Sequence, residues 1–130
     1  MKVLIVDEQL NGTINNQFEI NIETEFISLK ELIEKRVIQE VNNYNNKPTE
    51  FYNGLVEPTE FEKTLNKNLK SNKKKLIDAE KQVYVALNAF LKNGYFVLVD
   101  DVQIEELFEP IRIKKDSKIS FIKLTPLIGG

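Results

Sequence analysis

The chain has 130 residues and a mass of 15.1 kDa, which suits a single domain spanning residues 1–130. It contains neither cysteine nor histidine, which excludes disulfides, cysteine-ligated zinc and any Ser-His-Asp or Cys-His catalytic group built from this chain alone. The net charge is −2 and the hydrophobic fraction is 42%, as in ordinary globular chains. Any chemistry would use carboxylates, lysines and tyrosines, or would be performed on this chain by another protein. We expect no enzymatic activity, no bound cofactor and no metal.

The N-terminal segment indicates the compartment. Its apolar run Val3–Val6 is interrupted by Asp7, which makes it too short for a signal-peptide core of roughly 7–15 residues. No other stretch approaches the ~20 apolar residues that span a bilayer. We therefore expect this run to be a first β-strand, and the protein to be cytoplasmic and not membrane-bound.

Charge is distributed unevenly along the chain. The balance is −7 over residues 1–62, +5 over residues 63–81 and 0 over residues 82–130. Sites for single-stranded nucleic acid interleave aromatic residues with basic ones, and the central lysine run contains neither an aromatic residue nor an arginine. The favoured interpretation of this run is a solvated helix face or loop. The second is a docking surface for an acidic protein, formed by Lys70 and Lys73–Lys75, and nucleic-acid binding comes last. The lysines are Lys63, Lys67, Lys70, Lys73, Lys74 and Lys75.

The first part of the chain predicts a β-hairpin. Lys2–Asp7 has the composition of a buried strand, and Asn11-Gly12 is a strong turn signal. Gln17–Thr24 alternates apolar and polar residues, which is typical of a half-buried antiparallel strand.

A helix is expected directly after the hairpin. Ser28 and Glu31 form a capping box, in which a hydroxyl and a carboxylate satisfy free N–H groups at a helix start. Apolar residues then recur every fourth position, so we predict a helix over residues 29–43 that packs across the hairpin. The stripe consists of Leu29, Ile33, Val37 and Val41.

Residues 45–94 are interpreted as a helical insertion. Thr59–Glu62 forms a second capping box before a short helix, and Asp78 or Asn72 caps a further one. Asn93-Gly94 ends that last helix, with Gly94 in the positive-φ position. The apolar residues of the last helix are Val83, Tyr84, Leu87, Phe90 and Leu91.

The last part of the chain predicts further strands. Tyr95–Val99 is an uninterrupted apolar run, as in strands buried on both faces. Asp100-Asp101 opens a turn, and the apolar residues within 104–113 suggest one short irregular strand. Lys114–Ser117 is a polar turn, and Lys118–Leu124 alternates as a final strand.

Paired acidic residues raise the question of a metal site. Asp7-Glu8, Asp100-Asp101 and Glu105-Glu106 could each bind a divalent cation. None has the ligand spacing of a known metal-binding loop, so turns are the favoured interpretation and no metal is expected.

The order hairpin, helix, strands and a free tail ending in Gly129-Gly130 resembles the ubiquitin-like β-grasp family. The resemblance is closest to its prokaryotic sulfur-carrier branch, which comprises the small subunit of molybdopterin synthase and the thiamin-biosynthesis sulfur carrier. Residues 95–130 carry the likeness through a strand, a Leu-x-x-Pro-Ile element at Leu107, a polar turn and an apolar tail that contains proline. Residues 1–44 match in order and periodicity, so the likeness covers about 80 residues. It implies an α+β fold, a mixed sheet packed on a helix, with the insertion between the first helix and the third strand.

The resemblance also implies a reactive C-terminus. In the family, an adenylating enzyme joins the C-terminal carboxylate to AMP, and the acyl group then passes to a thiol or receives sulfur. Two residues without Cβ allow the tail, residues 125–130, to thread a narrow channel. On this basis Gly129 and Gly130 are the modification and activation residues, ATP is used by the partner enzyme, and target-protein lysines or a conjugating enzyme are further partners. The tail residues expected to contact the partner are Thr125, Pro126, Leu127 and Ile128.

Two departures from the family keep alternatives open. The insertion is not typical of sulfur carriers and adds docking surface. This favours a protein modifier of a bacterial kind over sulfur carriage through a thiocarboxylate. A non-covalent adaptor that uses the basic insertion is a further alternative. Because the printed sequence ends at Gly130, the resemblance implies that no peptidase is needed for maturation.

Overall fold

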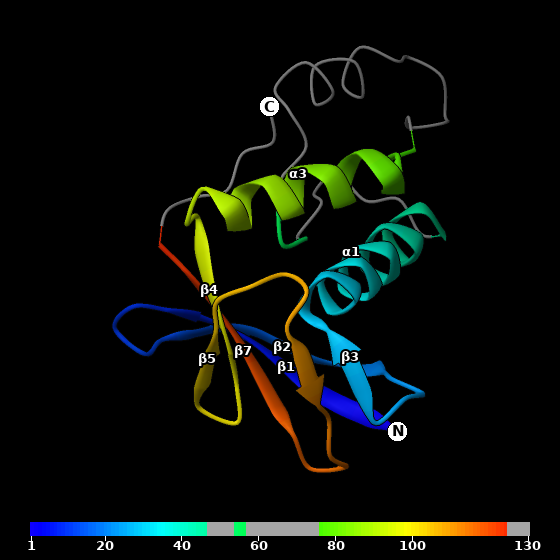
Figure 1. Ribbon diagram of the computed structural model, residues 1–130. Coiled ribbons are helices and arrows are strands. Elements are labelled where there is room, and N and C mark those ends of the chain that lie inside the picture. The colour runs from blue at the N-terminus through cyan, green and yellow to red at the C-terminus, as the bar shows by residue number, and fades with distance from the viewer. Residues whose placement is uncertain (47–53, 57–75, 125–130) are drawn as a thin grey trace.

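The computed structural model describes residues 1–46, 54–56 and 76–124, and it is an α+β structure with a mixed sheet below two helices (Figure 1). This confirms the predicted class. The predicted helix near Thr59–Glu62, the lysine run Lys63–Lys75 and the tail, residues 125–130, lie outside the described residues. Neither α1 nor α3 has the length and apolarity that a membrane crossing requires. The elements are β1 (Lys2–Gln9), β2 (Ile14–Asn21), β3 (Phe26–Ser28), α1 (Leu29–Asn46), α3 (Ala79–Leu91), β4 (Tyr95–Val99), β5 (Val102–Ile104), β6 (Pro110–Arg112) and β7 (Lys118–Lys123).

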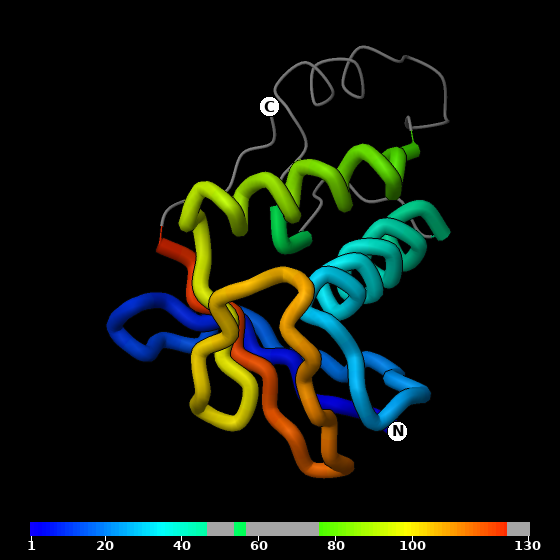
Figure 2. The backbone as a smooth tube through the Cα atoms, in the orientation of Figure 1, coloured from blue at the N-terminus to red at the C-terminus, as the bar shows by residue number. Residues whose placement is uncertain are grey.

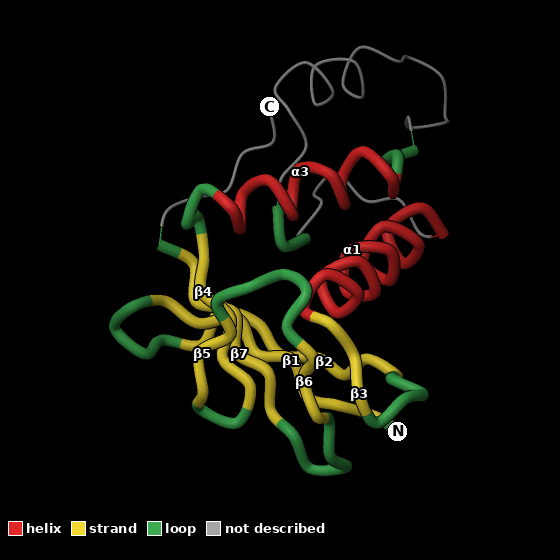
Figure 3. Tube along the Cα trace, in the orientation of Figure 1, coloured by secondary structure: helices red, strands yellow, loops and turns green. Residues whose placement is uncertain are grey.

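The main sheet has five strands in the order β2-β1-β7-β4-β5. β1 and β7 are parallel, with Leu4 opposite Lys118 and Gln9 opposite Lys123, and the other neighbours are antiparallel. The last strand therefore lies at the centre of the sheet and runs in the same direction as the first. The C-terminal end of β7 lies beside the end of β1, where the chain turns toward β2 (Figure 3).

The predicted N-terminal hairpin is confirmed. Gly12 has φ of +88°, a left-handed conformation that glycine adopts without strain, and its N–H donates to the Gln9 carbonyl at 2.9 Å. The second strand spans Ile14–Asn21 and not Gln17–Thr24, because pairing with β1 extends past the alternating segment through the polar residues next to the turn.

The first helix begins at Leu29, as predicted. The Ser28 Oγ accepts the Glu31 N–H at 3.2 Å, which is the hydroxyl half of the expected capping box. The helix ends at Asn46 and not at 43. Its last turn is fastened by Asn45, whose amide exchanges two hydrogen bonds with the Ile77 backbone at 2.9 and 3.0 Å. All four residues of the predicted stripe are at most 1% exposed and pack in the core above the sheet.

The second described helix, α3, packs against α1 (Figure 2). Asp78 is its N-cap, since the Asp78 carboxylate accepts the Glu80 and Lys81 N–H groups at 3.0 and 3.4 Å. The apolar face predicted for this helix is wrong in part, because Tyr84 and Leu91 are 70% and 65% exposed. The buried face consists of Gln82, Ala86 and Phe90.

Asp78→Ala is expected to lower the free energy of unfolding by about 1 kcal/mol, because two N–H groups of the first turn of α3 lose their acceptor. Urea denaturation measures the change. Asp78→Asn is the matched control, since asparagine also caps helices, and its effect should be smaller. Equal destabilisation by the two substitutions would contradict the capping role.

The end of α3 differs from the predicted end, in which Gly94 takes the positive-φ position. The left-handed residue is Asn93, with φ of 59°, and not Gly94. Asparagine tolerates this conformation. The N–H groups of Asn93 and Gly94 donate to the carbonyls of Phe90 and Ala89 at 3.0 and 2.8 Å, which closes the helix one residue earlier than expected.

β4 is not buried equally on both faces. Tyr95, Val97 and Val99 are buried under the helices, whereas Phe96 and Leu98 are half-buried on the other face. The predicted turn after β4 is confirmed, since Asp100 and Asp101 have φ of 49° and 68° and connect β4 to β5.

A second, two-stranded sheet was not predicted. β3 pairs with β6, with Ile27 opposite Ile111, and both side chains are buried. The single irregular strand expected within 104–113 is therefore two strands, β5 and β6, that belong to different sheets. Lys114–Ser117 forms the predicted turn into β7, where the Ser117 Oγ accepts the Lys114 N–H at 2.9 Å.

Candidate functional site

The residues predicted to be functional lie outside the described part of the chain. They are Gly129, Gly130, Thr125, Pro126, Leu127, Ile128, Lys70, Lys73, Lys74 and Lys75. The structure does describe the point at which the tail begins. The Leu124 N–H donates to the Gly94 carbonyl at 3.3 Å, and Lys123 lies opposite both Gln9 and Tyr95. The last described residues, Lys123 and Leu124, therefore lie at the end of the central strand, next to the C-terminal end of α3.

A buried charge cluster lies beneath α1. The Arg36 side chain is fully buried, and its two terminal nitrogens donate to the two Asp7 carboxylate oxygens at 2.6 and 2.7 Å. Its Nε donates to the Glu40 Oε1 at 3.2 Å, and Nη2 lies 3.4 Å from the Glu40 Oε2. One guanidinium thus bridges a strand carboxylate and a carboxylate one helical turn further along α1.

Two aromatic rings enclose the guanidinium. Its central carbon lies 4.4 Å from the centroid of Phe121 on β7 and 5.2 Å from that of Phe18 on β2. Burial by itself lowers the pKa of Arg36, but Glu40 and Asp7 reverse this effect and raise its pKa above the ordinary value. Arg36 therefore remains charged inside the core and joins α1 to three strands.

The sequence interpretation missed this cluster. Asp7 was predicted to end the first strand and, as the pair Asp7-Glu8, to begin a turn, but no buried partner was expected for it. Asp7 lies within β1 and is 3% exposed. The signal was present: Asp7 shares the strand face of Val3 and Ile5, which are buried. An acidic residue on a buried face requires a cation, and Arg36 follows Leu32 by one helical turn on the buried side of α1.

Glu40 fastens the segment 54–56 to the helix. Its Oε1 accepts the Leu55 N–H at 3.1 Å, and the Leu55 and Val56 side chains are each 1% exposed within the core. Burial raises the pKa of the Glu40 carboxyl group above its ordinary value, although Arg36 acts in the opposite direction.

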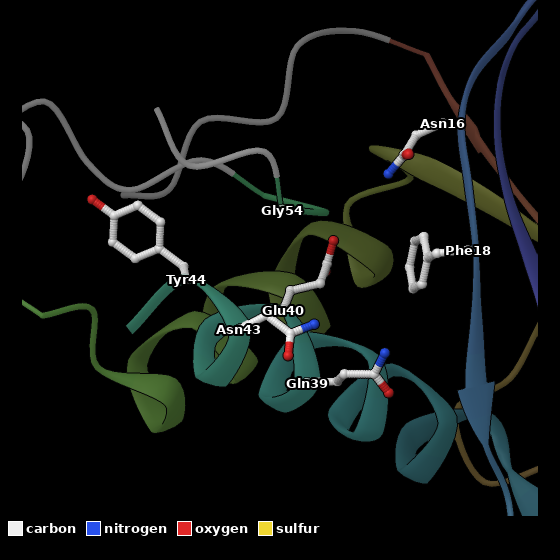
Figure 4. A pocket seen from close by; sticks show the side chains of 7 residues that line it. All are labelled: Asn16, Phe18, Gln39, Glu40, Asn43, Tyr44 and Gly54. Carbon is white, nitrogen blue, oxygen red and sulfur yellow. The ribbon is translucent and has the colours of Figure 1, made fainter. Parts of the chain in front are cut away.

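A pocket of about 230 Å³ lies above this carboxylate, between β2 and α1 (Figure 4). The Glu40 side chain rises from α1 toward the space between Phe18 and Gly54, and the phenol of Tyr44 points away from it. In the described part of the chain, the pocket is lined by one carboxylate, three amide side chains, two aromatic residues and a glycine. The described residues that line it are Asn16, Phe18, Gln39, Glu40, Asn43, Tyr44 and Gly54.

We expect the stability of the wild type relative to Glu40→Gln to fall as pH rises. Because the pKa of Glu40 is raised in the folded chain, the folded state holds this proton more firmly than the unfolded state. The resulting stabilisation is present below the ordinary carboxyl pKa and is lost as pH rises through the folded value. Urea midpoints of both proteins between pH 4 and pH 7, a window set by the ordinary pKa of about 4.3, measure the trend. A relative stability that increases with pH would contradict it.

Comparison with protein-family models, with curated proteins and with solved structures found no match to this chain. The proposals below therefore rest on its own residues and topology.

Proposed function

We propose that this chain is a ubiquitin-like β-grasp protein whose Gly130 carboxylate is adenylated by an activating-type enzyme and then transferred to target proteins as a modifier. The observation that carries the proposal is the parallel pair of the first and last strands, β1 and β7, at the centre of a mixed sheet. With the N-terminal hairpin and with α1 packed on that sheet, this supports the β-grasp assignment drawn from the order of elements.

The point at which the tail begins also supports this function. β7, the central strand of the sheet, ends beside Gly94, and the proposed tail follows directly in the sequence. Six residues follow Leu124 and span at most about 20 Å when extended. The two terminal glycines would allow close backbone approach inside a partner's channel.

The proposed chemistry uses groups that a partner supplies. A carboxylate oxygen of Gly130 attacks the α-phosphorus of ATP, which forms an acyl adenylate and releases pyrophosphate. A cysteine thiolate of the partner attacks the carbonyl carbon and releases AMP. A target lysine amine then displaces the thiolate, losing a proton as the amide bond forms. The absence of cysteine and histidine from this chain is compatible with this role. Because the proposed chemistry uses ATP, the proposal also expects a cytoplasmic protein.

Two alternatives predict different products. A sulfur carrier would accumulate a thiocarboxylate at Gly130 and form no lysine adducts. A non-covalent adaptor using Lys70 and Lys73–Lys75 would bind an acidic partner in a salt-sensitive way, and its binding would survive removal of the tail.

The test combines the full chain, ATP and an activating-type adenylating enzyme from the same organism, and measures intact mass. We expect an AMP adduct or a lysine conjugate for the wild type and neither for a chain lacking Gly129 and Gly130. The control substitution is Phe108→Ala, because the Phe108 side chain is 78% exposed. This variant should react as the wild type does. An unmodified wild-type chain, or a truncated chain that reacts equally well, would contradict the proposal.

A further inference from the structure

The pocket between β2 and α1 combines groups that match one class of ligand. Among the seven described residues that line it, Glu40 is the one charged residue, and the others are amides, aromatic residues and a glycine. Its side chain is mostly buried, with 11% exposed, and lines the pocket. Figure 4 shows this side chain directed away from the helix toward the pocket.

The Glu40 carboxylate retains capacity to accept a hydrogen bond. A carboxylate has about four lone-pair sites. Oε1 accepts two donors, the Arg36 Nε at 3.2 Å and the Leu55 N–H at 3.1 Å. Among the described residues, Oε2 has one long contact, 3.4 Å from the Arg36 Nη2. A donor approaching from the pocket would therefore find Oε2 largely unsatisfied.

The charges around the pocket favour a cation. Arg36 neutralises one of the two carboxylates that it binds, so the cluster with Asp7 and Glu40 carries one net negative charge when all three are ionised. A buried charge is costly unless it is paired. The burial that raises the pKa of Glu40 reflects this cost. A ligand with one positive charge would balance the cluster, whereas an anion would be repelled.

The remaining walls suit an ammonium group on a short apolar chain. Asn16 and Asn43 are exposed residues at the rim whose amide oxygens can accept from an ammonium. The half-buried ring of Phe18, over which the Arg36 guanidinium already lies, offers an apolar wall. A volume of about 230 Å³ limits the ligand to a small molecule.

We infer that this pocket binds a small organic cation through a primary ammonium group, with the Glu40 carboxylate as its charged partner. The inference concerns a second site and is independent of the proposed function of the tail.

The probe is n-butylammonium, titrated into the isotopically labelled full chain and followed by amide NMR shifts. n-Butanol and butyrate, which have similar size and shape, are the neutral and anionic comparisons. We expect saturable shifts around Phe18, Glu40 and Gly54 with n-butylammonium, and at least ten-fold weaker responses with the other two. Absence of saturation at 50 mM n-butylammonium would overturn the inference, since a dissociation constant of that size corresponds to only about 2 kcal/mol of binding free energy. Equal binding of n-butanol would also overturn it.

Two variants and a control complete the experiment. Glu40→Gln keeps an oxygen for the Leu55 N–H but removes the charge, so n-butylammonium should bind at least ten-fold more weakly. Glu34→Gln, on the same helix and 32% exposed at its side chain, should bind as the wild type does. Asn43→Ala changes an exposed residue and should fold normally, with several-fold weaker binding. Unchanged affinity in a folded Glu40→Gln protein, or in Asn43→Ala if the first variant does not fold, would refute the site.

Discussion

Arg36→Ala is expected to lower the free energy of unfolding by about 3–5 kcal/mol, because removing one partner of a buried ion pair leaves the other charge uncompensated. Asp7, 3% exposed, would lose both of its bonds to the guanidinium, and Glu40 would lose the cation that offsets its burial. Phe18 and Phe121 would also lose the group packed between them. A loss of this size is a large part of the 5–15 kcal/mol that stabilises a typical domain.

The matched control is Arg112→Ala. Arg112 also forms an ion pair, with Glu25 at 3.0 Å, but the two side chains are 62% and 58% exposed. Exposed pairs contribute about 0–1 kcal/mol. Urea denaturation of both variants measures the contrast. Similar losses in the two proteins would mean that Arg36 does not have the structural role assigned to it.

Phe121→Ala has the second large expected effect, a loss of about 3–5 kcal/mol. Phe121 is fully buried on the central strand β7, with its ring centroid 6.0 Å from that of Tyr95 and 4.4 Å from the Arg36 guanidinium carbon. Truncation would leave a cavity between the sheet and α1 and remove one side of the guanidinium's enclosure.

Phe108→Ala is the control for this substitution, since the Phe108 side chain is 78% exposed in the loop between β5 and β6. Its effect should lie within about 0.5 kcal/mol. Thermal or urea unfolding distinguishes the two. A change below 1 kcal/mol for Phe121→Ala, a value typical of an average substitution, would contradict the placement of Phe121 at the centre of the core.

The elements with local signals could be predicted from the sequence. The first helix begins after Ser28 because a cap precedes a long apolar stripe, and α3 begins after Asp78 for the same reason. The Asn11-Gly12 and Asp100-Asp101 turns were predictable because few residues adopt left-handed conformations.

Features that depend on distant partners were not predicted. β3 and β6 have three residues each, too few for an alternation to be recognised, and they form only because they pair with each other. The cluster of Asp7, Arg36 and Glu40 joins residues on different elements, 29 positions apart for Asp7 and Arg36. Hydrophobic periodicity treats such residues as surface residues. The pocket above Glu40 was missed for the same reason, since β2 and α1 come together only in the folded chain.

The state of the C-terminal peptide in cells tests the central proposal most directly. Trypsin cleaves after Lys123, so a conjugated target lysine would retain residues 124–130 as a remnant that mass spectrometry identifies. We predict this remnant on lysines of other proteins, and its loss when Gly129 and Gly130 are deleted. A thiocarboxylate on the C-terminal peptide, without any remnant on other proteins, would identify the chain as a sulfur carrier and not a modifier. A peptide present solely as the free acid would contradict activation at Gly130.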